Sequence, residues 1–294
     1  MPKIYKIVFW ISISLTALAI IATAIFGLRL SVDFRGGSVL ELEFSQRPAI
    51  SDIQTALGTQ SNDIEMSPAG DTGLILRTHE LTEADHQALL AKLTQAFPGS
   101  GLSERRFDSV GPVVGNELKH KSIIAIILVL FCVIVYIAFV FRKIGRTTSP
   151  WAMGLAAIVA LLHDIAIPVG VFAILGHYVG IEISGVFVAA ALTILGFSVS
   201  DTVIIFDRVR ENITRGGAKE DFGAVVHKSV LQTLARSLNT IFTVLLSLFA
   251  IYFFGGESIK YFSLALIIGI FLGAYSSIFV ASPLLVWWTK RRSS

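Results

Sequence analysis

Six stretches of the sequence are long and apolar enough to cross a lipid bilayer, and they limit what the chain can fold into more than any other feature. About 20 apolar residues are needed to span the hydrocarbon core. The qualifying stretches are residues 7–28, 122–141, 151–175, 183–206, 237–254 and 259–288. Backbone polar groups in lipid have to be satisfied within the segment, which stretches of this length achieve as helices. We therefore predict a polytopic α-helical membrane protein with six transmembrane helices.

The first stretch also has a feature of secretory signal peptides. Ala22-Thr23-Ala24 resembles a signal-peptidase site. The apolar core of a signal peptide is about 7–15 residues long, whereas this stretch runs for about 22 residues. We therefore expect an uncleaved transmembrane helix.

Charged residues are concentrated between the first two stretches. The whole chain is 15% charged, whereas soluble proteins are about 25% charged. Residues 29–121 carry 22 charges in 93 positions, which is the density of a soluble domain. We predict three parts: residues 1–28 with the first helix, a soluble domain at 29–121, and five further helices at 122–294.

Basic residues in the short connections predict the orientation. Cytoplasmic loops are enriched in Lys and Arg. One side of the predicted helices carries Lys3, Lys6, Arg142, Lys143, Arg146, Arg208, Arg210, Arg215, Lys219, Lys228, Lys290, Arg291 and Arg292. The connections near residues 176–180 and 255–258 carry none. Both termini are therefore expected in the cytoplasm, and the soluble domain on the outer face of the membrane.

The soluble domain reads as alternating strands and helices. Strands are expected at residues 39–44, 62–66, 73–78 and 105–110, and helices at 48–57 and 82–97. Thr82 is suited to cap the second helix, and Pro98-Gly99 to end it. The β-α-β-β-α-β order predicts a small ferredoxin-like α+β domain between the first two transmembrane helices.

Two acids stand inside predicted spans, where an ionised side chain costs about 2.5–3.5 kcal/mol on insertion scales. Asp164 lies midway along the third stretch, after His163, and Asp201 lies in the fourth, five residues before Phe206. Arg236 begins the fifth stretch from the same side of the membrane. We expect these residues to form a proton pathway.

The expected switch uses Asp201 and Arg236. Low dielectric favours the protonated carboxyl group, and a guanidinium nearby favours the ionised one. Approach and withdrawal of Arg236 would then load and unload a proton on Asp201. The alternatives are a static ion pair, or Arg236 as a positive-inside anchor. For His163 and Asp164, a hydrogen-bonded pair that only fixes helix packing is an equal alternative to a relay.

Small residues at four-residue spacing predict close helix contacts. The sixth stretch carries Ala265, Gly269, Gly273 and Ser277, and the fourth carries Gly185, Ala189, Thr193 and then Gly196. Such stripes are common in helix bundles and identify no substrate.

Residues 207–236 link the fourth and fifth stretches and include an apolar face at helical spacing. We expect an amphipathic cytoplasmic helix on the membrane surface within this segment. The alternative is a simple extension of the fifth helix into the cytoplasm.

Enzyme and cofactor motifs are lacking. The sequence contains no G-x-x-x-x-G-K-[ST] loop, H-E-x-x-H helix or G-x-S-x-G elbow. A net charge of +3 is too small to indicate nucleic-acid binding, and the single cysteine, Cys132, forms no intrachain disulfide. His79 and His86 are expected to be solvated. We predict a non-enzymatic protein with no cofactor or metal, powered by protons.

Several strings together resemble one family. They are Asp33-Phe34-Arg35-Gly36-Gly37, Gly111-Pro112-Val113-Val114-Gly115, His163-Asp164, the run from Gly196 through Ser198, Ser200, Asp201 and Thr202 to Asn212, Arg236-Ser237-Leu238-Asn239, and Gly273-Ala274-Tyr275-Ser276-Ser277-Ile278-Phe279 with Pro283. Together they identify the chain as similar to the SecD/SecF family of bacterial protein-export membrane proteins, which is related to the RND transporters.

The resemblance implies a mechanism and partners. The chain would supply six spans, half of an RND-like bundle, and pair with SecD. The pair assists the SecYEG translocon, and YidC-type insertases, by using the proton-motive force to pull or release unfolded preprotein. Asp201 and Arg236 match the family's proton-pathway residues, with Ser198, Ser200, Thr202 and Asn239 as supporting polar groups. Ser200 stands where the family often has Asn, with little expected consequence.

The glycine strings are the expected hinges between the membrane helices and the soluble domain. They comprise Asp33, Phe34, Gly36, Gly37, Gly111, Pro112 and Gly115. Turn chemistry alone explains these residues equally well. Two rival functions remain open: an RND-type exporter of small molecules or lipids, and a translocon or insertase scaffold that conducts no proton.

Overall fold

The structure is a computed structural model that describes residues 1–142, 148–216 and 221–293. It divides into a membrane unit, Met1–Arg29 with Ile123–Ser294, and an α+β unit, Leu30–Ser122. Lys143, Arg146 and Lys219, which contribute to the predicted orientation, lie outside the described residues.

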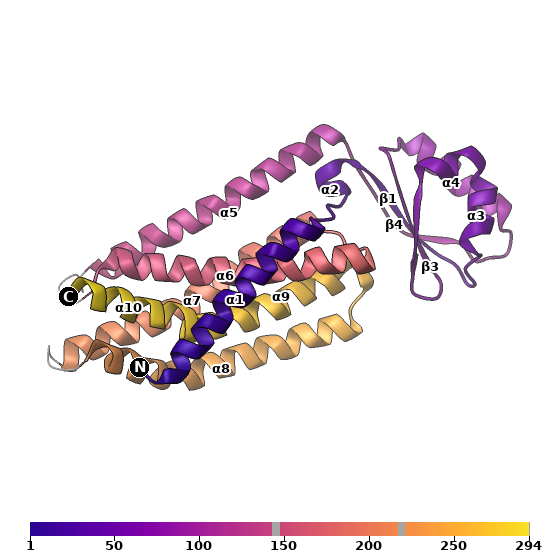
Figure 1. Cartoon of the computed structure of the whole chain (residues 1–294). Helices are drawn as coiled ribbons and strands as arrows, with labels where there is room; N and C mark the ends of the chain where they lie inside the picture. The colour runs from indigo at the N-terminus through magenta and orange to yellow at the C-terminus, as the bar shows by residue number, and fades with distance from the viewer. Residues whose placement is uncertain (143–147, 217–220, 294) are drawn as a thin grey trace. The chain divides into compact units, whose positions relative to one another are not determined.

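Six helical segments of the described chain are long and apolar enough to cross a membrane, as predicted. Five are α1 (Lys3–Phe26), α5 (Pro112–Val140), α6 (Pro150–Val179), α7 (Gly185–Gly216) and α8 (Phe222–Phe254) (Figure 1). The sixth is built from α9 (Glu257–Ser276), the π-helical turn η3 (Ser277–Ala281) and α10 (Ser282–Ser293). At 1.5 Å per residue, each is sufficient for a hydrocarbon core about 30 Å thick.

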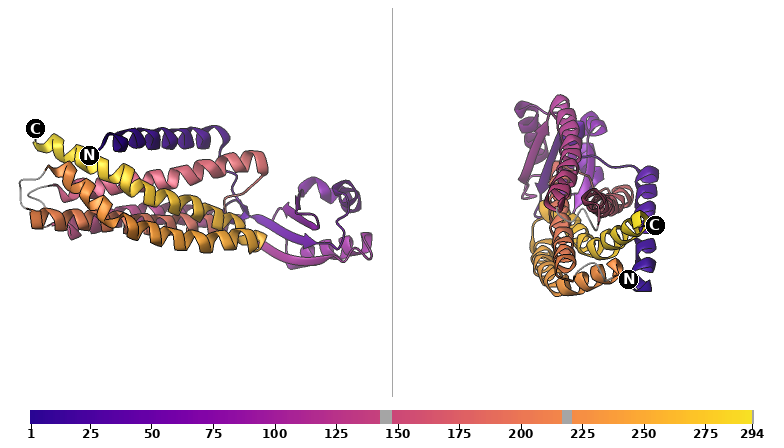
Figure 2. Two further views of the ribbon diagram at one scale, coloured as in Figure 1. Left: turned by 90° about the horizontal axis from the view of Figure 1, so that it is seen from below. Right: turned by 90° about the vertical axis from the view of Figure 1, so that its left-hand side faces the viewer.

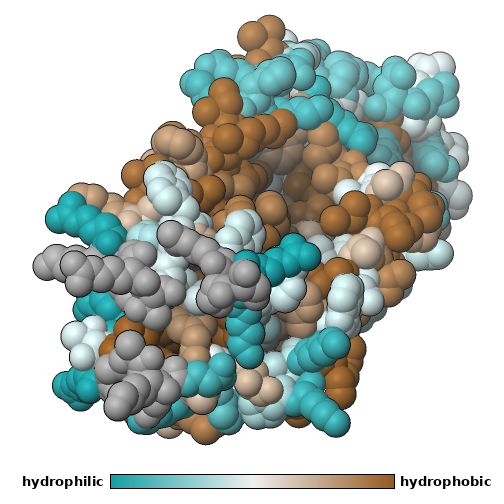
Figure 3. All heavy atoms as spheres, turned by 60° about the vertical axis from the view of Figure 1, so that its left-hand side comes forward, coloured by the Kyte–Doolittle hydropathy of each residue, from teal (hydrophilic) through white to brown (hydrophobic). Residues whose placement is uncertain are grey.

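The centre of the membrane unit is formed by α6 and the sixth span. In each of these two spans, half of the residues in the most apolar 18-residue stretch are buried. The corresponding share is 6% in α5 and 11% in α1. The buried cluster near one end joins Phe141, Met153, Phe206, Val226 and Leu285. The views of Figure 2 show α1 running along the outside of the unit, and Figure 3 shows a broad hydrophobic surface bordered by hydrophilic side chains.

The expected surface helix within residues 207–236 is not formed. α7 continues to Gly216, and α8 runs unbroken into the fifth span. Val226 of α8 is buried in the same cluster as Val209 of α7 and Leu285 of α10. Neighbouring helices therefore cover the apolar face that was assigned to the membrane surface, which agrees with the alternative of an extended fifth helix.

The α+β unit has the predicted strand and helix order. Its elements are α2 (Val32–Arg35), β1 (Gly37–Glu43), α3 (Ile50–Leu57), η1 (Gly58–Asp63), β2 (Glu65–Ala69), β3 (Gly73–Thr78), α4 (Glu83–Ala96) and β4 (Ser103–Val110). The antiparallel sheet has the order β2-β3-β1-β4, which is the ferredoxin-like arrangement. Period-2 alternation buries Leu40, Leu42, Leu74 and Leu76 against α3 and α4.

Two local features of α4 bear on the predictions. The Thr82 hydroxyl accepts a hydrogen bond from the backbone N–H of Asp85 at 3.3 Å, as a cap does. His86, expected to be solvated, is instead 3% exposed and stacks on Phe107 of β4 with ring centroids 3.8 Å apart. The sequence pattern missed this because an aromatic face can bury a polar ring whose nitrogen still reaches Glu104, at 3.2 Å.

Candidate functional site

The two glycine strings meet inside the α+β unit. Ser31 caps the short α2 by accepting from the Asp33 N–H, and Gly36 follows α2 with φ +79°. A Cβ atom on Gly36 would lie 2.7 Å from Pro112 Cα, and one on Gly115 would lie 3.0 Å from Gly36 N. The first separation is too short for a side chain and the second is tight, so the backbones approach this closely because both residues are glycine.

Gly37 is constrained in the same way. Its φ is +121°, and a Cβ there would lie 2.6 Å from the Thr78 carbonyl oxygen. Phe34 is buried, and Gly111 packs near the Glu80 side chain. The strings expected as hinges therefore form a close-packed junction between the start of β1 and the start of α5.

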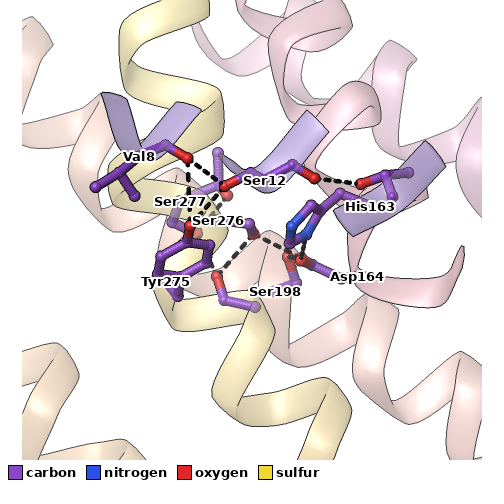
Figure 4. Close-up of polar contacts among 11 residues, drawn as sticks. Val8, Ser12, His163, Asp164, Ser198, Tyr275, Ser276 and Ser277 are labelled. Carbon is purple, nitrogen blue, oxygen red and sulfur yellow. Dashed lines mark hydrogen bonds and ion pairs between the residues drawn. The ribbon is translucent and has the colours of Figure 1, made fainter. Parts of the chain in front are cut away.

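The membrane unit contains a buried carboxylate at the middle of α6. Asp164 is fully buried, with 0% of its surface exposed. His163 Nδ1 lies 2.8 Å from Asp164 Oδ1, while the Ser198 and Ser276 hydroxyls donate to Oδ2 at 2.5 and 2.7 Å. Figure 4 shows these side chains gathered between the helices. Three spans, α6, α7 and α9, thus converge on one acid.

The donors of Asp164 can rearrange when the acid takes a proton. Within the described chain, neither Lys nor Arg forms an ion pair with Asp164; its ring partner is His163. Ser276 Oγ lies 3.1 Å from the Gly273 carbonyl oxygen as well as 2.7 Å from Asp164. Its single proton can satisfy either acceptor, so protonation of Oδ2 leaves Ser276 with another partner.

A second layer of polar groups adjoins this cluster. Thr202 Oγ1 and Ser277 Oγ are 2.8 Å apart between α7 and the sixth span. Ser12 Oγ of α1 lies 2.6 Å from Tyr275 Oη. Ser12, Tyr275 and Ser276 were not among the predicted site residues, although the family string contains the last two. The sequence feature that could have identified these three residues is that each is a polar residue within an apolar span.

Asp201 and Arg236 are not paired in the structure. Asp201 is partly buried, and the Ser237 hydroxyl lies 3.5 Å from its Oδ1. Arg236 is exposed, and no ion pair within 4.0 Å joins these two described residues. Ser200 and Asn239 are exposed as well. The predicted residues therefore divide into a buried group around Asp164 and an exposed group around Asp201.

Two of the three predicted packing glycines form a helix contact. A Cβ on Gly269 would collide with the side chain of Ile194, and one on Gly273 would lie 3.0 Å from Ser198 Cβ, so α9 and α7 approach closely there. Gly196 is exposed and has nothing within 4 Å of its Cβ position. Within this chain it packs against no helix.

The described residues contain no group of three or more His, Cys, Asp or Glu side chains arranged to hold a metal ion. The exchangeable protons of the two acids and their hydroxyl partners are the chemistry that the site offers.

Comparison with known proteins identifies the family. Residues 90–291 match the family described as "Protein export membrane protein SecD/SecF, C-terminal", and residues 21–46 match "SecD/SecF GG Motif". The protein translocase subunit SecF of Thermobaculum terrenum is 44% identical over 91% of this chain and 86% of that protein. The SecF of Anaerolinea thermophila is 36% identical over 95% of this chain and 91% of that protein.

Solved structures agree in fold. SecDF of Thermus thermophilus, described as a translocon-associated membrane protein, superimposes with a TM-score of 0.82 at 29% identity. SecDF in a super-membrane-facing form gives 0.69 at 30% identity. The match covers 98% of this chain but only 38% of each SecDF chain. This multi-pass membrane protein belongs to the SecD/SecF family, as a SecF subunit of the protein translocase.

Proposed function

We propose that the chain promotes preprotein translocation by coupling it to proton movement, as a non-enzymatic half of a SecD-type heterodimer. The observation that carries the proposal is the Asp164 carboxylate, fully buried in a membrane unit and held by hydroxyls that can change partners. Burying a lasting charge in hydrocarbon is costly, so such a group favours proton exchange. Each charge crossing 100 mV releases about 2.3 kcal/mol, which is a sufficient energy source.

Asp201 and Arg236 supply the switch. Their separation corresponds to the state in which a proton neutralises Asp201 and the guanidinium has withdrawn. When the proton leaves, the ionised carboxylate attracts Arg236, and α7 and α8 move together. Arg keeps its charge throughout, so it acts as a counter-ion and carries no proton.

Exposed polar groups on the spans support a membrane partner. Ser200, Arg236 and Asn239 are exposed on helices long and apolar enough to cross the membrane, and Gly196, one turn before Ser200 on α7, is uncovered. Lipid offers such groups no hydrogen bonds, whereas a second bundle does. The SecDF chains, of which this chain spans 38%, suggest SecD as that partner. SecYEG, a YidC-type insertase and the emerging preprotein are the further proposed partners.

The proposed location is the bacterial inner membrane, with both termini in the cytoplasm. The α+β unit then faces the periplasm, where unfolded preprotein emerges. Lys3 and Lys6 at the start of α1, and Lys290 and Arg291 in α10, support this orientation through the positive-inside rule.

The test is preprotein translocation into inverted membrane vesicles, with and without a proton-motive force. Asp201→Asn is expected to lose the part of translocation that depends on that force, because the amide cannot exchange a proton. The matched control is Asp207→Asn, on the same helix, where the acid is half exposed and paired with Arg210 at 2.6 Å. The control is expected to retain the force-dependent part.

The rival functions give different outcomes. If Asp201→Asn, present at normal levels, retained all of the force-dependent translocation, the result would favour a scaffold that conducts no proton. Accumulation of a lipid or drug with preprotein export intact identifies an exporter instead.

A further inference from the structure

We propose that protons leave the Asp164 cluster toward the amino-terminal end of α1, along a line of polar side chains that Phe279 interrupts as a gate. The inference rests on the proposed proton coupling and adds Ser12, Tyr5 and His227, which lie outside the family strings. The route joins an inner group, His163, Tyr275 and Ser12, to an outer group, Tyr5 and His227.

The inner group begins at an unpartnered nitrogen. His163 is 2% exposed, and its Nε2 has no hydrogen-bond partner in the described chain, although Nδ1 is engaged by Asp164. A buried ring nitrogen without a partner is costly, so Nε2 is suited to bind a water molecule. The His163 ring stacks at 6.0 Å on that of Tyr275, whose hydroxyl lies 2.6 Å from Ser12.

Both hydroxyls share a further acceptor on α1. The Val8 carbonyl oxygen accepts from Ser12 at 2.9 Å and from Tyr275 at 3.4 Å. Each hydroxyl can therefore donate to the other or to Val8. When one of these hydroxyls accepts a proton, it can release its own proton to the next acceptor. The two hydroxyls can therefore relay a proton without either of them keeping a net charge.

The outer group lies nearer the start of α1, about one helical turn before the Val8 carbonyl group. Tyr5 is 6% exposed, and its hydroxyl lies 3.0 Å from His227 Nδ1 on α8. Val8 follows Tyr5 by three residues, about 4.5 Å along the helix axis. His227 is only partly buried, which places the outer group where a proton can reach solvent.

Phe279 separates the two groups. Its ring packs against Tyr275 at 5.3 Å and against Tyr5 at 5.4 Å, and contributes no polar atom. It belongs to η3, the π-helical turn of the sixth span. π-Helical turns concentrate at functional sites because the extra residue loosens the regular hydrogen-bond ladder. The turn that carries Phe279 also follows directly after Ser276, so a change at Asp164 has a short path to the gate.

The titratable groups along the route come from four helices. They are Asp164 and His163 of α6, Tyr275 of α9, Tyr5 of α1 and His227 of α8. Among the described residues, no Lys or Arg is ion-paired or hydrogen-bonded to any of these five. No Lys or Arg side chain in contact with these groups therefore repels a proton that moves along the route.

The experiment measures proton flux, with a pH-sensitive dye, in proteoliposomes that hold the chain with its SecD-type partner. Tyr275→Phe and Ser12→Ala each remove one relay hydroxyl, and each is expected to lower flux by about tenfold, the effect of losing one hydrogen bond from a transfer barrier. The controls are Tyr178→Phe, an exposed tyrosine of α6, and Ser14→Ala, an exposed serine of α1. Both are expected to leave flux unchanged.

Opening the gate gives a change of opposite sign. Phe279→Ala is expected to raise flux about tenfold while lowering the translocation obtained per proton, and Phe271→Ala, on the exposed face of α9, to do neither. General loss of folding would change flux in the same direction in all these variants, so a rise in Phe279→Ala beside a fall in Tyr275→Phe distinguishes a gate from packing damage.

The outcomes separate this route from the proposed function. If the wild-type protein and Asp201→Asn show the same absence of flux, the proposed function fails. If the wild-type protein conducts, Asp201→Asn does not, and Tyr275→Phe, Ser12→Ala and Phe279→Ala all match the wild type, the route is wrong and the proposed function stands.

Discussion

Asp164 illustrates how a single residue in lipid is stabilised. Its two oxygens engage three side chains from three helices, so the cost of burial is offset locally. Hydrogen bonds to a charged group contribute about 1.5–3 kcal/mol each, more than bonds between neutral groups. The same bonds tie α6, α7 and α9 together, so changes at this acid reach three helices at once.

Removing one donor is expected to lower stability. Ser198→Ala deletes the 2.5 Å hydrogen bond to Asp164 and is predicted to cost about 1.5–3 kcal/mol of unfolding free energy. Ser200→Ala, two residues along on the exposed face of the same helix, is predicted to cost under about 0.5 kcal/mol. Unfolding in detergent followed by circular dichroism measures both. Equal losses in the two variants would contradict this role for Ser198.

The glycine junction gives a second prediction at the residue scale. Gly36 and Gly70 both have positive φ, at +79° and +64°, so alanine is strained at either position by about 1–3 kcal/mol. Only at Gly36 does the added Cβ also meet backbone, the Pro112 Cα at 2.7 Å, whereas Gly70 has nothing within 4 Å. Gly36→Ala is therefore predicted to be the more destabilising.

Limited proteolysis of the purified protein measures this difference. Faster cleavage of the α+β unit is expected in Gly36→Ala than in Gly70→Ala. If the two variants were cleaved equally fast, the positive φ alone would explain why alanine destabilises Gly36, and the contact with Pro112 would make no contribution.

At the scale of elements, α7 and α9 form a close helix contact. Gly269 leaves room for Ile194, and overpacking of such a contact costs about 1–3 kcal/mol. Gly269→Ala is predicted to destabilise by that amount, and Ile194→Ala in the same chain to recover part of it, because the colliding atoms are removed. Gly196→Ala, with open space around it, is predicted to be neutral or slightly stabilising.

A double-mutant cycle on thermal unfolding gives the coupling between the two positions. Additive effects of Gly269→Ala and Ile194→Ala would show that the collision is relieved elsewhere in the bundle.

Sequence reasoning predicted the elements better than their surroundings. Apolar length is enough to place six spans, and alternation with turn residues is enough for the ferredoxin-like order. Periodicity also found the apolar face around Val226, but it cannot say whether lipid or helices cover that face. In the structure, Val209 and Leu285 do.

The candidate site was predicted in part for the same reason. The cost of burial identifies Asp164 and Asp201 from sequence, and the family string supplies Ser198. Which hydroxyl reaches Asp164 depends on how α9 packs, so Ser276 was missed, and Ser12 was missed because its partner Tyr275 is brought to it by the packing of α1. The expected Asp201–Arg236 ion pair is absent from the described residues: Asp201 is partly buried beside the Ser237 hydroxyl, whereas the Arg236 side chain is exposed.

For the whole molecule, orientation is open to a direct test. In a chain whose Cys132 is replaced by Ala, Asp71→Cys in the β2–β3 turn and Lys3→Cys at the start of α1 provide exposed single thiols. A membrane-impermeant maleimide added to spheroplasts is predicted to label the first and not the second until the cells are lysed. Labelling of Lys3→Cys in intact spheroplasts would reverse the proposed topology.

The central claim is that proton movement through this chain powers translocation, and proton flux tests it most directly. The measurement compares proteoliposomes that hold the wild-type chain, Asp201→Asn or Arg236→Met, each with the SecD-type partner, under an imposed pH gradient. The account predicts flux in the wild type and its loss in both variants, in step with the loss of force-dependent translocation. Undiminished flux in Asp201→Asn, with the variant assembled and present at wild-type levels, would contradict it.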